Sequence, residues 1–344
     1  MHAAGRRRLL IAACAALATG SGRAQQRRAG HIAILHTTPA FSAAFRARLR
    51  ELGYVEGQNL RIDEGLDVAT PQVLERLPGA ATEAASEGVD LIFAGGGELT
   101  VKAIQRGAPN TPLVMLFVDV DPVARGIVAS LSRPGGNVTG VYSHHIELAA
   151  KRLQILREAV PSTRRMAVLY DASSRDQFKS AQDAASAISL TLIPQELRGS
   201  TYDVDGALRD ASRQGADSLL ILSSAQFFPH RATIARTALA LRLPSAGNPT
   251  FAEMGALLGY GPTLPGMFAQ GAEIADRILR GTKPADIPIQ QADRIELVVN
   301  RTTANALGVS MPRSLLDRAD RILNASLGGG QAPRELERRA TDDA

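Results

Sequence analysis

The stretch HIAILHTTPAFSAAFRARLRELG, residues 31–53, contains the unit on which the fold prediction rests. Residues 31–36 are rich in isoleucine and leucine, which is typical of a short buried strand. A helix is expected to follow the Thr37-Thr38-Pro39 turn and to stop at Gly53. Its apolar face consists of four residues at helical spacing, Phe41, Phe45, Leu49 and Leu52. We therefore predict a strand followed by an amphipathic helix.

This unit recurs in two series along the chain. In the first series, further strands are expected at residues 60–62, 89–94, 113–118 and 138–142. In the second series, they are expected at residues 166–170, 190–193, 218–222, around 243, and 256–259. Strands that alternate with helices at this spacing form parallel sheets with right-handed crossovers. The sequence therefore predicts an α/β protein of two lobes, each a parallel sheet flanked by helices.

The last part of the chain departs from the second series. A long helix from about residue 264 to Gly281, a strand at 294–300 and a helical stretch at 305–323 with a break at Pro312 are expected. We expect this part to return to the first lobe, so that several strands join the lobes as a hinge. The predicted organisation is a signal peptide at 1–24, lobe 1 at 25–143 plus 262–327, lobe 2 at 144–261, and a disordered tail at 328–344.

The first 24 residues have the organisation of an export signal. Arg6-Arg7-Arg8 is a basic start, residues 9–18 are an apolar run, and Gly22-Arg23-Ala24 offers small residues for cleavage. The paired arginines also resemble a twin-arginine signal, so the export route stays open. Residues 11–14 resemble a lipoprotein box, but only five apolar residues precede Cys14. We therefore favour cleavage after Ala24 and a periplasmic protein over lipid anchoring at Cys14.

Composition and charge exclude two classes of protein. The chain of 344 residues is 45% apolar and 21% charged, which excludes a disordered or fibrous protein. The net charge is +5, but four arginines lie in the first 24 residues and the remaining 320 residues carry only +1. No basic face is left for a nucleic acid, so no nucleic-acid partner is expected.

The candidate site follows from the carboxyl ends of the predicted strands, where open parallel sheets bind ligands. These ends carry mainly hydroxyls, amides and glycines, which suit a small polar or zwitterionic solute. The candidates in the first lobe are Thr37, Thr38, Gly96, Gly97 and Asp119. Those in the second lobe are Asp171, Ser173, Ser174, Ser223, Gln226, Asn248 and Tyr260. Asp119 or Asp171 would pair with the ammonium group of an amino acid.

The sequence lacks the motifs of nucleotide-binding proteins, of metal sites and of enzymes with a nucleophilic serine. The Gly95–Gly97 turn has neither the third glycine of a dinucleotide fingerprint nor a P-loop lysine, and a tight turn is the alternative for its glycines. Asp121-Pro122 fits a helix N-cap. His144-His145 lacks a partner at metal-ligand spacing, and no nucleophile elbow is present. We expect no metal, no cofactor and no catalytic residue.

Several longer motifs resemble a known family. They are LRELGYVEGQN (49–59), GIVASLSRPGGNVTG (126–140), FFPHR (227–231), GYGP (259–262), GTKPADIP (281–288) and ELVVN (296–300). They are similar to the uncharacterised ABC-transporter substrate-binding family that includes the tryptophan-binding proteins. The resemblance implies a type I periplasmic-binding-protein fold, whose two lobes close on a solute. The turns at 96–99, 170–174 and 223–226 depart from the family's pattern, so the resemblance does not carry over a ligand.

The resemblance implies a receptor, not an enzyme: an exported protein that hands a small solute, such as an amino acid, to an ABC permease in the inner membrane. A monomer is the simpler expectation. Two alternatives stay open, a periplasmic sensory protein that uses the same fold and a two-lobe exported enzyme. The identity of the solute is also open.

Overall fold

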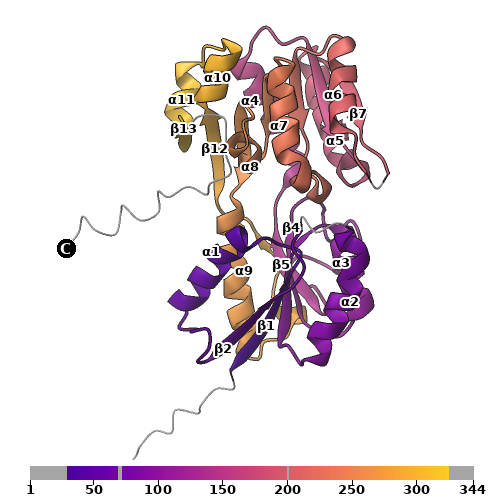
Figure 1. The fold of residues 1–344 in the computed structure, drawn as a ribbon, viewed down its shortest axis with the longest axis vertical. Helices are drawn as coiled ribbons and strands as arrows, with labels where there is room; N and C mark the ends of the chain where they lie inside the picture. Colours follow the sequence, from indigo (N-terminus) through magenta and orange to yellow (C-terminus); the bar gives the residue numbers. More distant parts are fainter. Residues whose placement is uncertain (1–28, 69–71, 200, 325–344) are drawn as a thin grey trace, which may run out of the picture.

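The computed structural model describes residues 29–68, 72–199 and 201–324, which form two α/β lobes arranged end to end (Figure 1). The expected signal peptide and the expected C-terminal tail lie outside these residues. No helix in the described part is long and apolar enough to cross a membrane.

The first lobe is built on a six-stranded parallel sheet with the strand order β11-β5-β4-β3-β1-β2. Its strands are β1 (Gly30–Leu35), β2 (Leu60–Glu64), β3 (Leu91–Gly96), β4 (Leu113–Phe117), β5 (Val138–Tyr142) and β11 (Gln290–Gln291). Helices α1 (Pro39–Glu51) and α9 (Leu264–Leu279) pack on one face, and α2 (Val73–Ser86) and α3 (Glu98–Gly107) on the other. The strand–turn–helix unit predicted at residues 31–53 is confirmed.

The second lobe contains a seven-stranded sheet in the order β13-β12-β10-β9-β8-β6-β7. Its strands are β6 (Arg165–Tyr170), β7 (Thr191–Glu196), β8 (Ser218–Ile221), β9 (Ser245–Gly247), β10 (Leu258–Pro262), β12 (Ile295–Asn300) and β13 (Arg321–Leu323). One face carries α4 (His145–Ala159), α5 (Arg175–Ala187), α10 (Arg301–Leu307) and α11 (Arg313–Arg318). The other carries α6 (Val204–Arg213), α7 (Arg231–Ala240) and α8 (Pro249–Glu253). Short 3₁₀ turns are η1 (Ala172–Ser174), η2 (Ala225–His230) and η3 (Pro284–Asp286).

The C-terminal segment divides between the lobes, which corrects the predicted boundary of 262–327. Helix α9 and β11 do return to the first lobe, but residues 295–323 belong to the second sheet. The reason is that the apolar run Leu297–Val299 of β12 pairs antiparallel with β10 and is buried in the core of the second lobe. The expected helix at 305–323 is also wrong at its end, where β13 pairs with β12.

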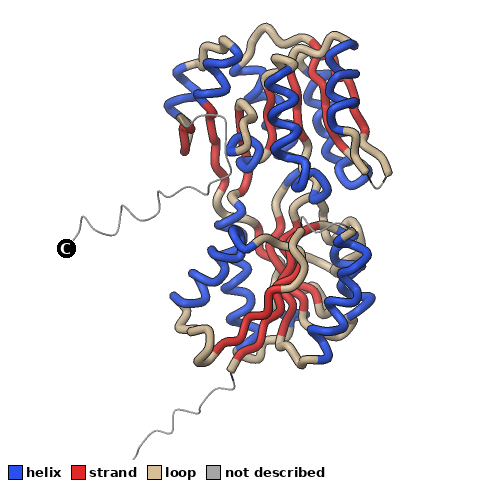
Figure 2. Tube along the Cα trace, in the orientation of Figure 1, coloured by secondary structure: helices blue, strands red, loops and turns tan. Residues whose placement is uncertain are grey.

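The chain passes between the lobes three times in the described part. The crossings follow β5, β10 and β11 and lead into α4, α9 and β12. Figure 2 shows the loops of both lobes meeting at the junction, with the strands of the first lobe running toward it. This multi-strand hinge, together with the two helix-covered sheets, gives the type I periplasmic-binding-protein fold.

Candidate functional site

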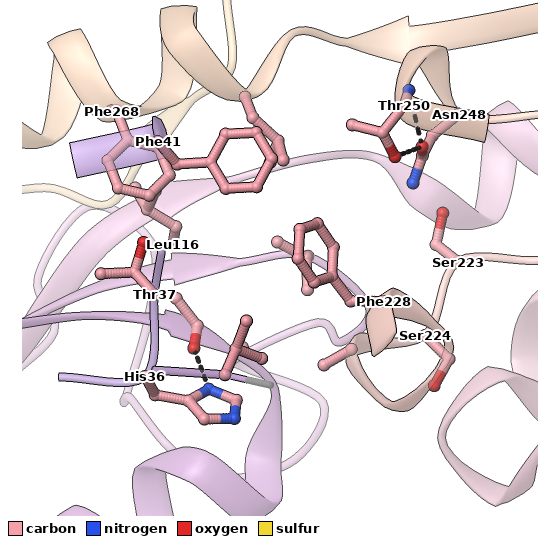
Figure 3. Close-up of a pocket in the computed structure, with 16 residues that line it drawn as sticks. His36, Thr37, Phe41, Leu116, Ser223, Ser224, Phe228, Asn248, Thr250 and Phe268 are labelled. Carbon is pink, nitrogen blue, oxygen red and sulfur yellow. Dashed lines mark hydrogen bonds between the residues drawn. The ribbon is translucent and has the colours of Figure 1, made fainter. Parts of the chain in front are cut away.

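A cavity lies between the lobes, at the carboxyl ends of strands from both sheets (Figure 3). It contains about 620 Å³ of space not occupied by atoms, its open mouth included. Residues at the carboxyl ends of β1, β3 and β4 line it from the first lobe, and residues that follow β8 and β9 line it from the second.

One wall of this cavity is aromatic, and we call it the aromatic wall: Phe41, Phe228 and Phe268. Phe41 lies in the first turn of α1, with its ring centroid 5.3 Å from that of Phe228 in an edge contact. It lies 6.1 Å from the ring of Phe268, at the start of α9. The guanidinium of Arg231 covers Phe228, its central carbon 3.9 Å from the ring centroid. These contacts form a surface suited to a flat apolar group.

A second wall, on the second-lobe side, is polar and uncharged: it consists of Ser223, Asn248 and Thr250 (Figure 3). Thr37 also lines the cavity, from the first lobe, and the Ser224 hydroxyl is engaged by Asp171. The hydroxyl oxygen of Thr37 is buried and has no hydrogen-bond partner among the described residues. Asn248 Oδ1 accepts from the Thr250 backbone N–H at 3.1 Å and from its hydroxyl at 2.6 Å, which holds the Asn248 side chain in place.

His36 forms the floor at the first lobe. Its Nδ1 lies 2.6 Å from Gly95 O, to which it donates, and its side chain is almost completely buried. Burial lowers the pKa of His36, so the ring is neutral at physiological pH. Among the described lining residues there is thus neither a carboxylate nor a cation.

Asp119 lies in a different place, where the lobes contact each other directly. Its Oδ2 accepts from the Ala225 backbone N–H at 2.8 Å. The Ser173 hydroxyl, which donates to Asp171 Oδ1 at 2.6 Å, lies 3.4 Å from the same oxygen. Ala225 and Ser173 both belong to the second lobe. Asp119 is 3% exposed, and its Oδ1 has no partner in the described part of the chain. Burial raises the pKa of Asp119 to about 6. Asp119 thus links the first lobe to the second in this structure.

Asp171 is a structural residue of the second lobe. It caps η1 by accepting from the Ser173 N–H at 2.9 Å, and it also accepts from the hydroxyls of Ser174 and Tyr202. Its Oδ2 accepts from the Ser224 hydroxyl at 2.5 Å. Both carboxylate oxygens are thus occupied by donors of the same lobe, which leaves Asp171 little capacity for a ligand.

The described residues contain one group with metal-ligand chemistry, far from this cavity along the first sheet. Atoms of His31, Asp63 and Glu87 lie within 4.8 Å of one another. The guanidinium of Arg61 already pairs with Asp63 at 2.9 Å and with Glu87 at 2.8 Å. A resident cation therefore neutralises these carboxylates, and we assign no metal site to them.

Residues 39–323 match the model of a family described as ABC transporter substrate binding protein. The chain belongs to this family. Its resemblance to that family, inferred from the motifs between residues 49 and 300, is confirmed.

The chain is also similar in sequence to one named relative and in fold to solved structures. The chain is 26% identical over 270 residues to the tyrosine-binding protein of Clostridioides difficile strain R20291, covering 76% of this chain and 75% of that protein. Its fold is similar to the ABC domain from Streptococcus pneumonia in complex with L-Trp, with a TM-score of 0.73 and 19% identity over 85% of this chain and 99% of that one. A conserved domain protein from Vibrio cholerae also gives 0.73, with 23% identity over 86% and 100% of the two chains.

The predicted ligand-binding residues of this family member divide into three groups. Four of them line the cavity with the aromatic wall: Thr37, Gly96, Ser223 and Asn248. Four others line a second cavity of about 820 Å³ beside the interlobe contact: Gly97, Asp119, Ser173 and Gln226. Four line neither: Thr38, Asp171, Ser174 and Tyr260.

The aromatic wall is absent from the prediction, which took residues with hydroxyl, amide or carboxylate groups, and glycines, at the ends of strands. The other lining residues it did not include are His36, Val68, Gly95, Leu116, Val118, Ser224, Ala225, Thr250 and Leu264. A signal for Phe41 and Phe228 was nonetheless present, because they lie five and six residues after the ends of the strands predicted at residues 31–36 and 218–222.

Proposed function

We propose that this substrate-binding protein is an exported receptor that binds an aromatic amino acid between its lobes and delivers it to an ABC permease. The cavity is the observation that carries the proposal, because a wall of three phenylalanine rings faces a wall of hydroxyls and an amide. An aromatic amino acid has the same division between a flat ring and a polar end. The tyrosine-binding protein and the structure that holds L-Trp point to the same class of ligand.

Binding would act by closing the lobes. Phe41 and Thr37 belong to the first lobe, whereas Phe228, Ser223 and Asn248 belong to the second, so a solute that contacts both walls favours the closed form. The three chain crossings between the lobes provide the hinge for this motion. A permease would then distinguish the closed, loaded receptor from the open one.

Two further features support export and transport. The basic and apolar start of the chain, residues 6–24, is typical of an export signal. The family itself is that of ABC-transporter substrate-binding proteins, whose partner is a permease. We propose a periplasmic monomer as the working unit.

Thermal unfolding of the full chain against a panel of amino acids tests the proposal. A ligand at about 100 times its Kd adds about 2.7 kcal/mol to the folded state, which raises the Tm by several degrees. We expect shifts with tyrosine, tryptophan or phenylalanine and none with alanine, glutamate or lysine. Native mass spectrometry of the purified protein identifies any ligand retained from the cell. A charged or aliphatic solute found there, with no response to aromatic amino acids, would overturn the proposal.

A further inference from the structure

A buried arginine lies directly behind the polar wall of the cavity. Arg152 of α4 is 1% exposed. Its Nε donates to Tyr260 O at 2.6 Å and one terminal nitrogen donates to the Ser223 hydroxyl at 2.9 Å. No ion pair joins it to a carboxylate of the described residues, and burial lowers its pKa to about 10. The guanidinium therefore carries a full charge at neutral pH.

A buried cation without a carboxylate is costly, so its position requires a compensating partner. The guanidinium of Arg152 is accommodated beside strand β10, which precedes one of the three chain crossings. Gly261 has φ +147°, and a Cβ there would lie 2.8 Å from a terminal nitrogen of Arg152. The second glycine of the GYGP motif thus accommodates the guanidinium, which places its charge next to Ser223.

Ser223 is held in one orientation by the residues around it. Gln177 bonds both its backbone groups, accepting from the Ser223 N–H at 2.9 Å and donating to Ser223 O at 2.8 Å. The hydroxyl oxygen accepts from Arg152, and a hydroxyl has only one proton of its own. That proton is therefore available to the cavity, on the side where Figure 3 shows Asn248 and Thr250.

We propose that Ser223, with Arg152 behind it, is the subsite for the carboxylate of the ligand. This inference rests on the proposed function and extends it, because it assigns one end of the cavity to an anion. Ser223 donates to the carboxylate, and Arg152 acts as a positioning residue that fixes the direction of this donor and supplies positive potential. The ring of the ligand then lies against the aromatic wall. The lining offers no carboxylate to an ammonium group among the described residues, so the carboxylate contributes more to recognition than the amine.

Calorimetry on the full chain with three probes tests this assignment: L-tyrosine, L-tyrosinamide, which lacks the carboxylate, and 3-phenylpropionate, which lacks the amine. We expect the unmodified protein to prefer tyrosine over its amide by at least about tenfold, as a hydrogen bond to a charged group would give. Ser223→Ala and Arg152→Met should weaken tyrosine and 3-phenylpropionate by about tenfold or more. The affinity for the amide should stay within about threefold or rise.

Two variants separate positioning from a purely structural effect. Arg152→Lys keeps the charge and should retain part of the preference for the carboxylate. Arg157→Met changes an arginine of the same helix that bonds Pro161 O outside the cavity, and it should change neither affinity. If Arg152→Met does not fold, as judged by its thermal transition, Ser223→Ala decides.

Each outcome distinguishes the two claims. Equal losses for the carboxylate and the amide in Ser223→Ala, or no preference in the unmodified protein, overturn the carboxylate subsite but leave the amino acid receptor intact. Binding of 3-phenylpropionate without binding of tyrosine supports the subsite and overturns the amino acid proposal. If none of the carboxylates binds, both are overturned.

Discussion

The lobes meet in two neighbouring regions that differ in what joins them. Around Asp119, groups of the protein itself form the contact, since its carboxylate accepts from the Ala225 N–H of the other lobe and lies beside the Ser173 hydroxyl. Around the aromatic wall, the lobes instead leave a cavity, with one edge contact between Phe41 and Phe228. The first region can stabilise any closed form, whereas in the second most of the contacts across the lobes have to come from a ligand of the right shape. Closure and selectivity are therefore assigned to different residues.

The largest expected effect comes from the aromatic wall. Phe228→Ala should weaken tyrosine binding by about 2 kcal/mol, or about thirtyfold, because both the buried ring surface and the contact with Phe41 are lost. Calorimetry measures the loss. The matched control is Phe178→Ala, whose ring stacks on Tyr170 outside both cavities at 4.4 Å. An equal loss in both variants would show that the wall acts through stability alone.

Removal of the interlobe contact at Asp119 should lower ligand affinity less than the loss of the Phe228 ring does. It should also lower the affinity for different ligands equally. Asp119→Ala removes the interlobe hydrogen bond from the Ala225 N–H and the longer contact with the Ser173 hydroxyl, so we expect affinity to fall by about tenfold for tyrosine and for 3-phenylpropionate alike. The second probe has no ammonium group. A loss confined to tyrosine would contradict this and would make Asp119 the ammonium partner.

The same carboxyl group predicts a pH dependence. Its pKa is about 6 in the closed form, and about 4 is expected once opening exposes it to water. Closure therefore takes up a proton, so ligand affinity should rise as the pH falls from 7.5 to 5, severalfold and with a limit of about tenfold. The comparison of unmodified protein with Asp119→Asn, titrated over this range, isolates the effect. A parallel rise in the variant would assign it to another group.

The smallest effect on ligand affinity is expected at the solvent-exposed edge of the contact between the lobes. Arg125 of the first lobe bonds Asp176 of the second at 3.2 Å, and both side chains are solvent-accessible. Exposed ion pairs contribute about 0–1 kcal/mol, so Arg125→Ala should lower affinity by no more than about fivefold at low salt. The difference should vanish in 0.5 M NaCl. A loss that persists in high salt would indicate that Arg125 contacts the ligand.

Local sequence patterns predict the strands and helices well because each of them depends mainly on the residues within it. The strand at residues 138–142 and the helix stop before Gly53 are confirmed. The assignment of β12 to the first lobe was wrong because its apolar run Leu297–Val299 fits the core of either lobe. Only the pairing of β12 with β10 decides between the two lobes.

The site was harder to predict because two residues of its aromatic wall lie on the same helical faces as residues of the core. Phe41 and Phe268 share a helical face with core residues such as Phe45 and Ala272. Helices α1 and α9 begin at the junction between the lobes, so their first turns face the cavity while later turns face the sheet. The periodicity of apolar residues identifies the apolar face of a helix. It does not tell which turns of that face pack on the sheet and which line a cavity. Arg152 was likewise hidden, as one charged residue in an amphipathic stretch.

The division of the C-terminal segment has a consequence for synthesis. Neither lobe is contiguous, because the first requires α9 and the second requires β12, which come after residue 262. A chain still being made would therefore hold two incomplete cores, one with Phe93 uncovered by Phe268 and one with β10 unpaired on the side of β12. Such intermediates expose apolar surface and strand edges, which favours aggregation. Both lobes should thus complete their folding together, near the end of synthesis, and neither should be obtainable as a simple fragment.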